Sequence, residues 1–252
     1  INASKTSIFF IDPKQSVEIK DFGTIKEIKK WANYYRADIY HNDSLKLKTQ
    51  FRCNGSDEYV SWVESLLYNE PFESSDQEVD YDIKVYDNPM DMKNEIIKKN
   101  INNKSRMISG DVFPWLSRTD KTAIDIIIGD FQAQWNRTKT FATDIKAIDE
   151  VGCIHTVQGM EFEYIGLIIG DDLLYRNGKV ITDYTKHPDS AAEFKRPHQK
   201  YVDPSDKDII DLLIRNTYRV LFSRGQKGCY IYCVDKELSD YLRSRIKGDL
   251  KR

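Results

Sequence analysis

The chain has 252 residues, of which 40% are hydrophobic and 31% charged, a composition typical of a soluble globular protein. Its 38 basic and 40 acidic side chains give a net charge of -2, so a nucleic-acid partner would require a local basic patch. No stretch approaches the ~20 apolar residues that cross a membrane, and the first residues lack the features of a signal peptide. We therefore expect a cytoplasmic protein without a membrane partner.

The first part of the chain contains two predicted strands and two predicted helices. Residues 7–11 (SIFFI) form an apolar run of buried-strand type, and a chain that opens on Ile1 and a core strand is expected to continue upstream. Residues 24–36 place apolar side chains near one face of a helix, and residues 56–68 predict a second helix behind a capping segment, GSD. Between them, residues 45–49 (LKLKT) alternate as a half-exposed strand does.

The rest of the chain alternates strands with helices around two irregular segments. Residues 69–82 carry six carboxylates and no basic side chain, as a solvated loop does, and the polar, proline-containing residues 171–205 are typical of an excursion from a sheet. The predicted strands are 83–86, 106–109, 124–128, 153–156, 164–169 and 228–234, and the predicted helices are 90–100, 208–221 and 238–246. This alternation predicts an α/β fold, a mostly parallel sheet with helices on both faces and residues 124–128 buried within it.

The four cysteines are too few and too scattered for a disulfide framework. Cys229 and Cys233 lie in one predicted strand at a spacing that puts both on the same face. We expect buried, reduced thiols there in preference to a metal or redox site.

Four short segments carry residue types suited to phosphate chemistry. They are residues 11–15 (IDPKQ), 50–52 (QFR), 155–162 (HTVQGMEF) and 218–225 (YRVLFSRG). Each could place a group at the carboxyl edge of the sheet, where open α/β folds bind ligands.

The side chains of these segments suggest complementary roles. Arg52 and Arg224 carry planar, permanently charged groups suited to phosphate oxygens, and the Gln15 amide can orient a water molecule. Gly159 permits a turn whose amides can point at an anion, and Glu161 could accept hydrogen bonds from a sugar hydroxyl. Two arginines and a glutamine at one phosphate would form a clamp for phosphoryl transfer.

The four segments resemble motifs of superfamily 1 helicases, a branch of the P-loop NTPases. The motifs are III (Asp-Pro-x-Gln), IV (Gln-Phe-Arg), V (Thr-x-Gln-Gly-x-Glu) and VI (Tyr-x-x-x-x-Ser-Arg). The phrases QFRCNGSDEYVSW, VGCIHTVQGMEFEYIGLIIGDDL and NTYRVLFSRGQKGCYIYCVD are similar, more closely, to the Schlafen group 3-like DNA/RNA helicase domain, a family of uncharacterised bacterial proteins described as ATP/GTP-binding. The likeness runs from about residue 7 to the C-terminus. A lone QG-x-E is a weak signal, whereas four motifs in the right order are specific.

The resemblance implies a domain division, cofactors and partners. Residues 1–44 would finish a first RecA-like domain, and residues 45–252 would form most of a second, with ATP and Mg²⁺ between them. The partners would be an N-terminal P-loop domain of the same protein and single-stranded DNA or RNA. The resemblance implies catalytic roles for Arg224, Arg52 and Gln15, nucleotide contacts for Gly159, Glu161 and Gln158, and a nucleic-acid contact for Thr156.

Two elements of the family are missing from the chain. It contains no G-x-x-x-x-G-K-[ST] phosphate loop, and no Walker B acidic pair precedes the Asp-Pro-x-Gln segment. The resemblance places both upstream of Ile1, with the main phosphate and metal ligands; a degenerate family member is the alternative. The chain by itself is expected to bind ATP weakly and to hydrolyse essentially none.

Each candidate residue also has a structural interpretation. Arg52 could pair with a carboxylate of its own domain, and Arg224 could cap the helix that precedes it. Gln15 could be a turn residue, and Glu161 could satisfy the first turn of a helix.

Further features have two interpretations as well. Trp115 and Trp135 lie among basic and aromatic residues, where they could stack on the bases of a single strand or anchor loops to the core. His155 lies in a predicted strand and is interpreted as a packed core residue in preference to a catalytic base. The basic segment 93–106 could face phosphates, although a solvated helix face is the simpler interpretation.

The leading hypothesis is the second motor domain of an ATP-dependent nucleic-acid helicase or translocase. One alternative is a non-enzymatic module that binds nucleic acid or protein. Another is an ATPase switch that hydrolyses ATP without unwinding strands.

Overall fold

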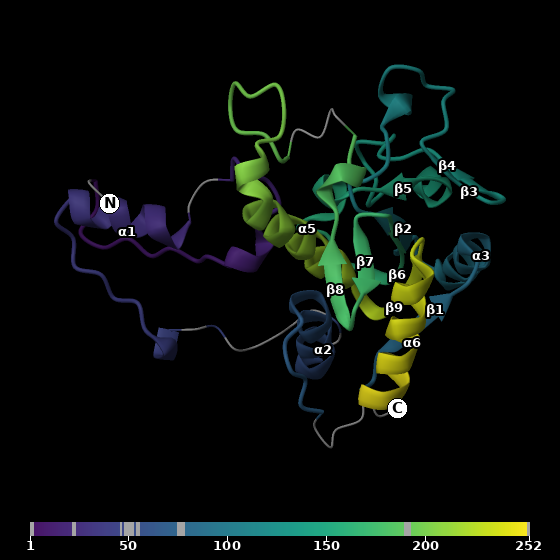
Figure 1. The fold of residues 1–252 in the computed structure, drawn as a ribbon, viewed down its shortest axis with the longest axis horizontal. Coiled ribbons are helices and arrows are strands. Elements are labelled where there is room, and N and C mark those ends of the chain that lie inside the picture. The colour runs from purple at the N-terminus through teal and green to yellow at the C-terminus, as the bar shows by residue number, and fades with distance from the viewer. Residues whose placement is uncertain are drawn as a thin grey trace.

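The computed structural model describes residues 3–21, 24–45, 47, 53, 56–74, 79–188 and 193–250. Its centre is a five-stranded parallel sheet in the order β1-β9-β6-β2-β5, which confirms the predicted α/β fold (Figure 1). The strands are β1 (Asp82–Tyr86), β2 (Ser105–Ser109), β5 (Val151–Gly152), β6 (Phe162–Ile169) and β9 (Gly225–Cys233). Parallel neighbours require long crossover connections, and helices or loops supply them here.

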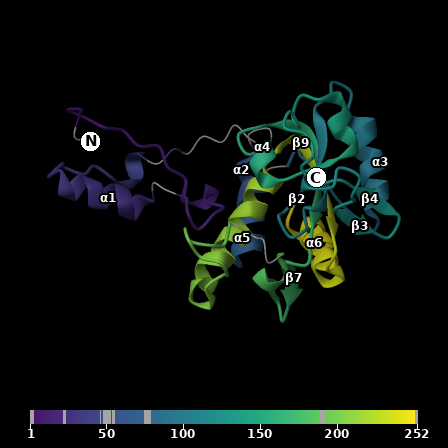
Figure 2. The same ribbon diagram turned by 90° about the horizontal axis from the view of Figure 1, so that it is seen from above.

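Helices cover both faces of this sheet (Figures 1 and 2). The helices are α1 (Ile25–Tyr34), α2 (Asp57–Tyr68), α3 (Pro89–Lys99), α4 (Ile154–Val157), α5 (Lys207–Phe222) and α6 (Lys236–Asp249). The larger core holds apolar side chains of α2, α4, α5 and α6. The smaller core, on the opposite face, holds those of α3 and of the hairpin β3 (Ile126–Ile128) and β4 (Phe131–Ala133). In the described part of the chain, no helix has the length and hydropathy needed to cross a membrane.

The strand sequences explain this burial on two faces. In β6, Ile165 and Leu167 enter the larger core and Ile168 enters the smaller one, as the two-residue repeat of a strand requires. A Cβ at Gly228 of β9 would lie 2.5 Å from the Asp82 carbonyl oxygen, so only glycine fits where β1 approaches. The four cysteines are buried and form no disulfide, as the sequence predicts.

Local capping sets the ends of the helices. The Ser56 side chain accepts a hydrogen bond from the Tyr59 backbone N–H and starts α2, and Asn69 ends it with a left-handed φ of 55°. Thr24 and Glu27 form a capping box at the start of α1. These ends agree closely with the predicted ones because the capping residues are visible in the sequence.

Three predictions about short apolar runs are wrong. Residues 7–11 are extended and exposed, because no strand of the described chain pairs with them. Residues 124–128 contribute only β3, which pairs antiparallel with β4 outside the main sheet after a turn at Gly129-Asp130. Residues 153–156 begin the short helix α4 and are not a strand. Apolar runs of this length fit a strand and a helix equally well.

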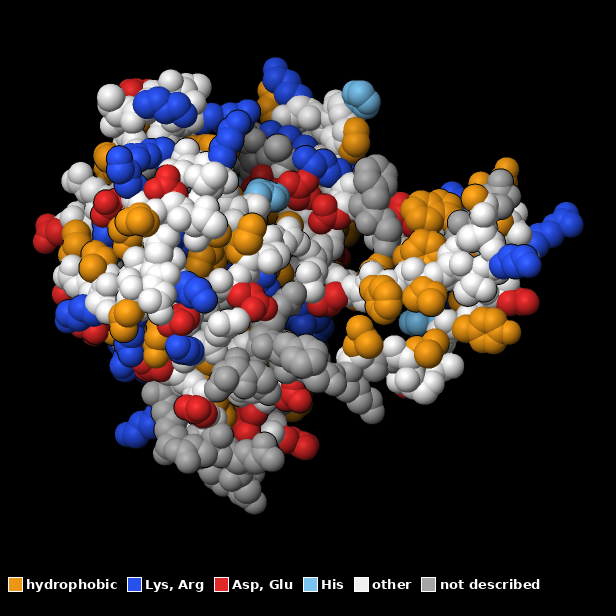
Figure 3. Space-filling view, turned by 180° about the vertical axis from the view of Figure 1, so that it is seen from behind, with side chains coloured by type: hydrophobic (Ala, Val, Ile, Leu, Met, Phe, Trp, Pro, Cys, Tyr) orange, Lys and Arg blue, Asp and Glu red, His pale blue; other side chains and the backbone are white. Residues whose placement is uncertain are grey.

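An N-terminal arm, made of the described residues between 3 and 47, extends away from the sheet domain (Figures 1 and 2). It carries exposed apolar side chains, drawn in orange at the right of Figure 3; Phe10 is 81% exposed and Tyr34 79%. Val17 is instead 4% exposed and lies in the larger core. The arm is therefore anchored to the sheet domain near residue 17. The predicted division at residue 44 stays a prediction, and most of the predicted strand 45–49 lies outside the described residues.

The predicted excursion after β6 begins with a hairpin, β7 (Leu173–Arg176) and β8 (Lys179–Thr182). It turns at Asn177-Gly178, where both residues have positive φ, as the tight two-residue turn of a hairpin requires. The short 3-10 helices are η1 (Pro13–Gln15), η2 (Asp43–Leu45), η4 (Leu116–Arg118), η5 (Ile145–Asp149), η6 (Tyr184–Lys186) and η7 (Pro204–Asp206). The last two lead the excursion back to α5.

Candidate functional site

The motif V segment connects β5 to β6 through α4 and a tight turn. The Thr156 hydroxyl caps α4: it accepts from the Cys153 backbone N–H and donates to the Cys153 carbonyl, both at 3.0 Å. Gly159 follows with a φ of 84°, a value that favours glycine. Nothing lies within 4 Å of the place where a Cβ would be, so the turn is open on that side.

Gln158 and Glu161 are exposed on either side of Gly159. Gln226 Nε2 donates to Glu161 Oε2 at 2.7 Å, which orients this carboxylate beside the start of β9. Because Glu161 directly precedes a strand, its interpretation as a first-turn helix residue is wrong. An exposed, oriented carboxylate of this kind can accept a hydrogen bond from a hydroxyl group.

Arg224 of motif VI lies between α5 and β9 and is only 1% exposed. Its Nε donates to the Val220 carbonyl at 2.9 Å, and its Nη2 to Ser223 Oγ at 3.2 Å. These bonds match the helix-end interpretation of Arg224. Its Nη1 also donates to the Met160 carbonyl at 3.1 Å, which places the guanidinium directly behind the Gly159 turn.

Motifs V and VI meet at the amino ends of β6 and β9. The Phe162 backbone N–H donates to the Arg224 carbonyl at 2.9 Å, and Phe162 pairs with Gly225. Their expected location at the carboxyl edge of the sheet is therefore wrong. Motif VI comes directly before β9, and motif V, although it follows β5, reaches its Gly159 turn just before β6 begins.

The motif III segment forms η1, which lies against α5. Asp12 caps it, and its Oδ2 accepts from Gln15 Nε2 at 3.0 Å. From α5, Arg219 Nη1 lies 3.2 Å from Asp12 Oδ2. Burial alone would raise the pKa of Asp12, but Arg219 and the Gln15 hydrogen bond lower it below its usual value. Gln158 Nε2 of motif V donates to the Gln15 carbonyl at 3.3 Å. Motif III thus lies beside motifs V and VI.

The three candidate nucleic-acid residues occupy different places. Thr156 is half-buried and caps α4. Trp135 is 6% exposed and lies in the smaller core, where Trp115 stands edge to face against it with ring centroids 5.8 Å apart. This packing agrees with the loop-anchoring interpretation. Trp115 is 37% exposed, and the Arg118 guanidinium lies 5.4 Å from its ring centroid. Base stacking by either tryptophan stays a prediction.

The structure also locates the other basic candidates. His155 is exposed on α4, with Nε2 3.3 Å from Glu18 Oε1, so its interpretation as a packed core residue is wrong. Within segment 93–106, Arg106 is fully buried and cannot belong to a phosphate-facing stripe. Arg52 lies outside the described residues, and its role stays a prediction.

A buried polar cluster at the carboxyl end of β6 joins Tyr218 of motif VI to His187 and Asp172, which belong to no motif. His187 Nε2 lies 3.0 Å from Asp172 Oδ2, and its Nδ1 lies 3.4 Å from Glu193 Oε1. Tyr218 of α5 donates to Asp172 Oδ1 at 2.5 Å. The His187 and Asp172 side chains are 4% and 2% exposed. The cluster therefore fastens the excursion to both β6 and α5.

We expect His187 to make folding stability depend on pH. Burial alone would lower the pKa of His187, but its bonds to Asp172 and Glu193 raise it to about 9. A raised folded-state pKa contributes stability that is complete below the unfolded value of about 6.5 and is lost as the pH rises through about 9. The Tm should therefore fall between these pH values, and it should fall less in His187→Gln. Parallel Tm profiles for the two proteins would contradict this role.

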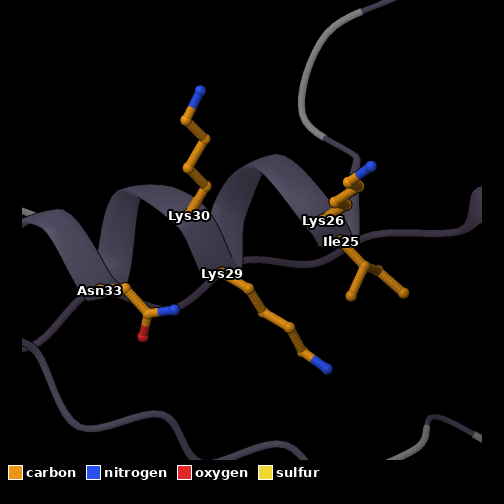
Figure 4. Close-up of a pocket in the computed structure, with 5 residues that line it drawn as sticks. All are labelled: Ile25, Lys26, Lys29, Lys30 and Asn33. Atoms are coloured by element: carbon orange, nitrogen blue, oxygen red, sulfur yellow. The ribbon is translucent and has the colours of Figure 1, made fainter.

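The pocket on α1 is separate from these motifs. It is an open depression lined by Ile25, Lys26, Lys29, Lys30 and Asn33, all on one helix, and their side chains point in different directions (Figure 4). Among the described residues, no group of three or more His, Cys, Asp and Glu side chains could hold a metal ion. The contacts between the motif segments build the candidate site from η1, α4, α5 and the amino ends of β6 and β9.

Comparisons with known proteins identify the family of the chain. The family described as "Schlafen group 3, DNA/RNA helicase domain" matches residues 1–235. A Saccharomyces cerevisiae protein, "Uncharacterized protein YPL245W", is 27% identical over 222 residues, which cover 79% of this chain and 48% of the yeast protein. The chain thus spans about half the length of that relative. Among solved structures, the C-terminal domain of a possible DNA helicase from Lactobacillus plantarum WCFS1 is 11% identical, with a TM-score of 0.26. The match covers 71% of this chain and 85% of the solved chain, and its low TM-score adds nothing to the assignment. The family match extends over most of the sequence, and the chain belongs to the Schlafen group 3 DNA/RNA helicase domain family.

Proposed function

We propose that this chain supplies the second motor lobe of an ATP-dependent helicase or translocase that acts on single-stranded DNA or RNA. One observation carries the proposal: three motif segments that are far apart in the sequence meet in one place. The Gln158 side chain donates a hydrogen bond to the Gln15 carbonyl, and Arg219 forms an ion pair with Asp12. Arg224 bonds the turn between α4 and β6. Membership of a helicase-domain family supports the same function.

The nucleotide would lie against the open turn at Gly159. The backbone there can approach an anion closely, and Glu161 can accept a hydrogen bond from the ribose. Arg224, behind the turn, and Arg52 would contact the terminal phosphate, and Gln15 would orient the attacking water. Bound ATP with Mg²⁺ supplies the phosphoryl group. These residues would contact one side of the nucleotide, and a phosphate loop from the rest of the protein would hold the other side.

The exposed apolar side chains of the N-terminal arm support a protein of two lobes. Ile8 is 77% exposed and Phe10 81%, although such side chains are usually buried in a core. We place them against the P-loop domain of the first lobe. The two lobes would close on ATP and open after hydrolysis.

The burial of Arg224 favours a second candidate function. In this alternative the chain is a module that binds nucleic acid or protein without hydrolysis, and Arg224 only joins the end of α5 to the turn before β6. A further alternative, an ATPase switch, would hydrolyse ATP without separating strands.

The test is ATP hydrolysis by the complete natural protein with and without single-stranded DNA or RNA. We expect nucleic acid to stimulate hydrolysis, and we expect ATP-dependent displacement of a labelled strand from a duplex. Stimulated hydrolysis without displacement or translocation would favour the switch. No hydrolysis, from a protein whose mass confirms an intact phosphate-loop domain, would overturn the proposal and favour the binding module.

A further inference from the structure

A carboxylate outside the four motifs connects motif III to motif VI. Glu64 of α2 accepts from Arg219 Nε at 2.7 Å through Oε1 and from Lys14 Nζ at 2.5 Å through Oε2. Arg219 belongs to the motif VI segment, and Lys14 is the residue next to Gln15 in motif III. The Glu64 carboxylate thus bridges two cations, Lys14 and Arg219, that lie far apart in the sequence. Asp12, two residues before Lys14, also contacts Arg219, at a separation of 207 residues.

Protein atoms largely shield this bridge from water. The exposed fractions of the side chains are 22% for Glu64, 15% for Arg219 and 35% for Lys14. Burial alone would raise the pKa of Glu64, but the hydrogen bonds from Lys14 and Arg219 lower it below its usual value. Charge-assisted bonds in such a part-buried place hold their geometry better than an exposed ion pair does.

A second connection fixes the other end of the same segment. Tyr68 of α2 donates its hydroxyl to Asn216 Oδ1 at 2.7 Å, and Asn216 Nδ2 donates to the Ser16 carbonyl at 2.9 Å. Lys14 Nζ also lies 4.6 Å from the centroid of the Tyr68 ring. The buried Val17 follows directly. Helices α2 and α5 therefore hold η1 at both of its ends.

We infer that Glu64 is a positioning residue that fixes Gln15 relative to the motif VI helix. The inference rests on the proposed function, in which Gln15 orients water at the terminal phosphate. Glu64 acts through Lys14 and Arg219 and does not itself touch the nucleotide. A displacement of about 1 Å in such a group is enough to cost much of the rate. Loss of the bridge should therefore slow the chemical step and leave ATP binding nearly intact.

The test compares Glu64→Gln with Asp211→Asn in the complete protein. Asp211 is a matched control, because its carboxylate accepts two hydrogen bonds from Arg215 of the same helix, α5. It also accepts from Thr182 of β8, so its contacts lie toward the hairpin and not toward η1. Lys14→Met removes the bridge from its other end and serves as a second variant should Glu64→Gln fold poorly.

Hydrogen exchange in a peptide spanning residues 12–19 is the first readout, because it does not depend on activity. We expect exchange there to be roughly 10-fold faster in Glu64→Gln and in Lys14→Met, and unchanged in Asp211→Asn. The same exchange rate in all four proteins, or equal acceleration in the control, would overturn the inference.

Steady-state ATP hydrolysis with single-stranded nucleic acid is the second readout. We expect kcat to fall roughly 10-fold in Glu64→Gln and KM to change by less than about 2-fold, with both constants near wild type in Asp211→Asn. A rise in KM at unchanged kcat would contradict a positioning role. If the wild-type protein hydrolyses no ATP, the proposed function fails, and the exchange measurement still decides whether Glu64 fixes the segment.

Discussion

Arg224→Lys in the complete protein is expected to slow nucleic-acid-stimulated ATP hydrolysis by about 10³-fold or more. Lysine keeps the positive charge, but its ammonium group cannot present the planar, two-pronged set of donors that a guanidinium offers to phosphate oxygens. The substitution therefore tests the donor geometry of the side chain at this position while its positive charge is kept. The measurement is kcat at saturating ATP and nucleic acid, with thermal unfolding recorded on the same samples.

Folding must be followed beside turnover because Arg224 is 1% exposed and donates hydrogen bonds to its own domain. Arg196→Lys is the control: Arg196 forms an ion pair with Asp206 at 2.7 Å at the start of α5, away from the motif turn. We expect the control to keep wild-type turnover. A folded Arg224→Lys protein that hydrolyses ATP at the wild-type rate would show that Arg224 is structural.

Elements with a long pattern are predicted correctly, and so are the five-residue strands β1 and β2. Helices α2 and α5 repeat their apolar residues often enough to show which face is buried, and β6 and β9 have continuous apolar runs between polar segments. The prediction for residues 153–156 fails because so few residues do not distinguish strand from helix, whereas residues 7–11 form neither element, because no strand of the described chain pairs with them. The hairpin β3–β4 had a usable signal, since Gly129-Asp130 between two apolar runs is typical of a two-residue hairpin turn.

The candidate site is predictable in its residue types but not in its contacts. The order of the motifs predicts that Gln15, Gln158 and Arg224 share one site, and the structure brings their segments together. Glu64 is invisible to this reasoning, because it belongs to no motif and meets Arg219 across 155 positions of the chain. The same holds for Arg106, which a sequence pattern treats as an exposed basic residue, although it is buried and donates to backbone carbonyls distant in the sequence.

Arg106 supports the loop that leads into motif V. Its Nε donates to the Phe141 carbonyl at 3.0 Å, and its Nη2 donates to the Ala142 and Asp144 carbonyls at 3.3 and 3.0 Å. Phe141 packs under β5, where a Cβ at Gly152 would lie 2.5 Å from its ring. Since α4 and the motif V turn continue from β5, the buried cation helps to set the position of the candidate site.

Arg106→Met is expected to lower the free energy of unfolding of this lobe by about 3–5 kcal/mol. Methionine has a similar length, but it leaves the carbonyls of Phe141, Ala142 and Asp144 without this donor at a site that is 0% exposed. In a lobe of this size the loss corresponds to a fall of roughly 10 °C in Tm. Thermal unfolding of the complete protein, with hydrogen exchange of residues 139–146, is the measurement.

Arg243→Met is the control for Arg106→Met, because it removes an arginine from a more exposed place. Arg243 is 33% exposed and pairs with Asp87 at 2.8 Å, and we expect its loss to change stability by no more than about 0.5 kcal/mol. The two arginines differ mainly in whether water can replace them as hydrogen-bond donors to their partners. If both variants unfold at the wild-type temperature and exchange around residues 139–146 is unchanged, water satisfies the carbonyls, and the position of β5 does not depend on Arg106. If only Arg106→Met unfolds early, the loop before β5 is fixed by its buried cation, and motif V depends on a residue that no helicase motif contains.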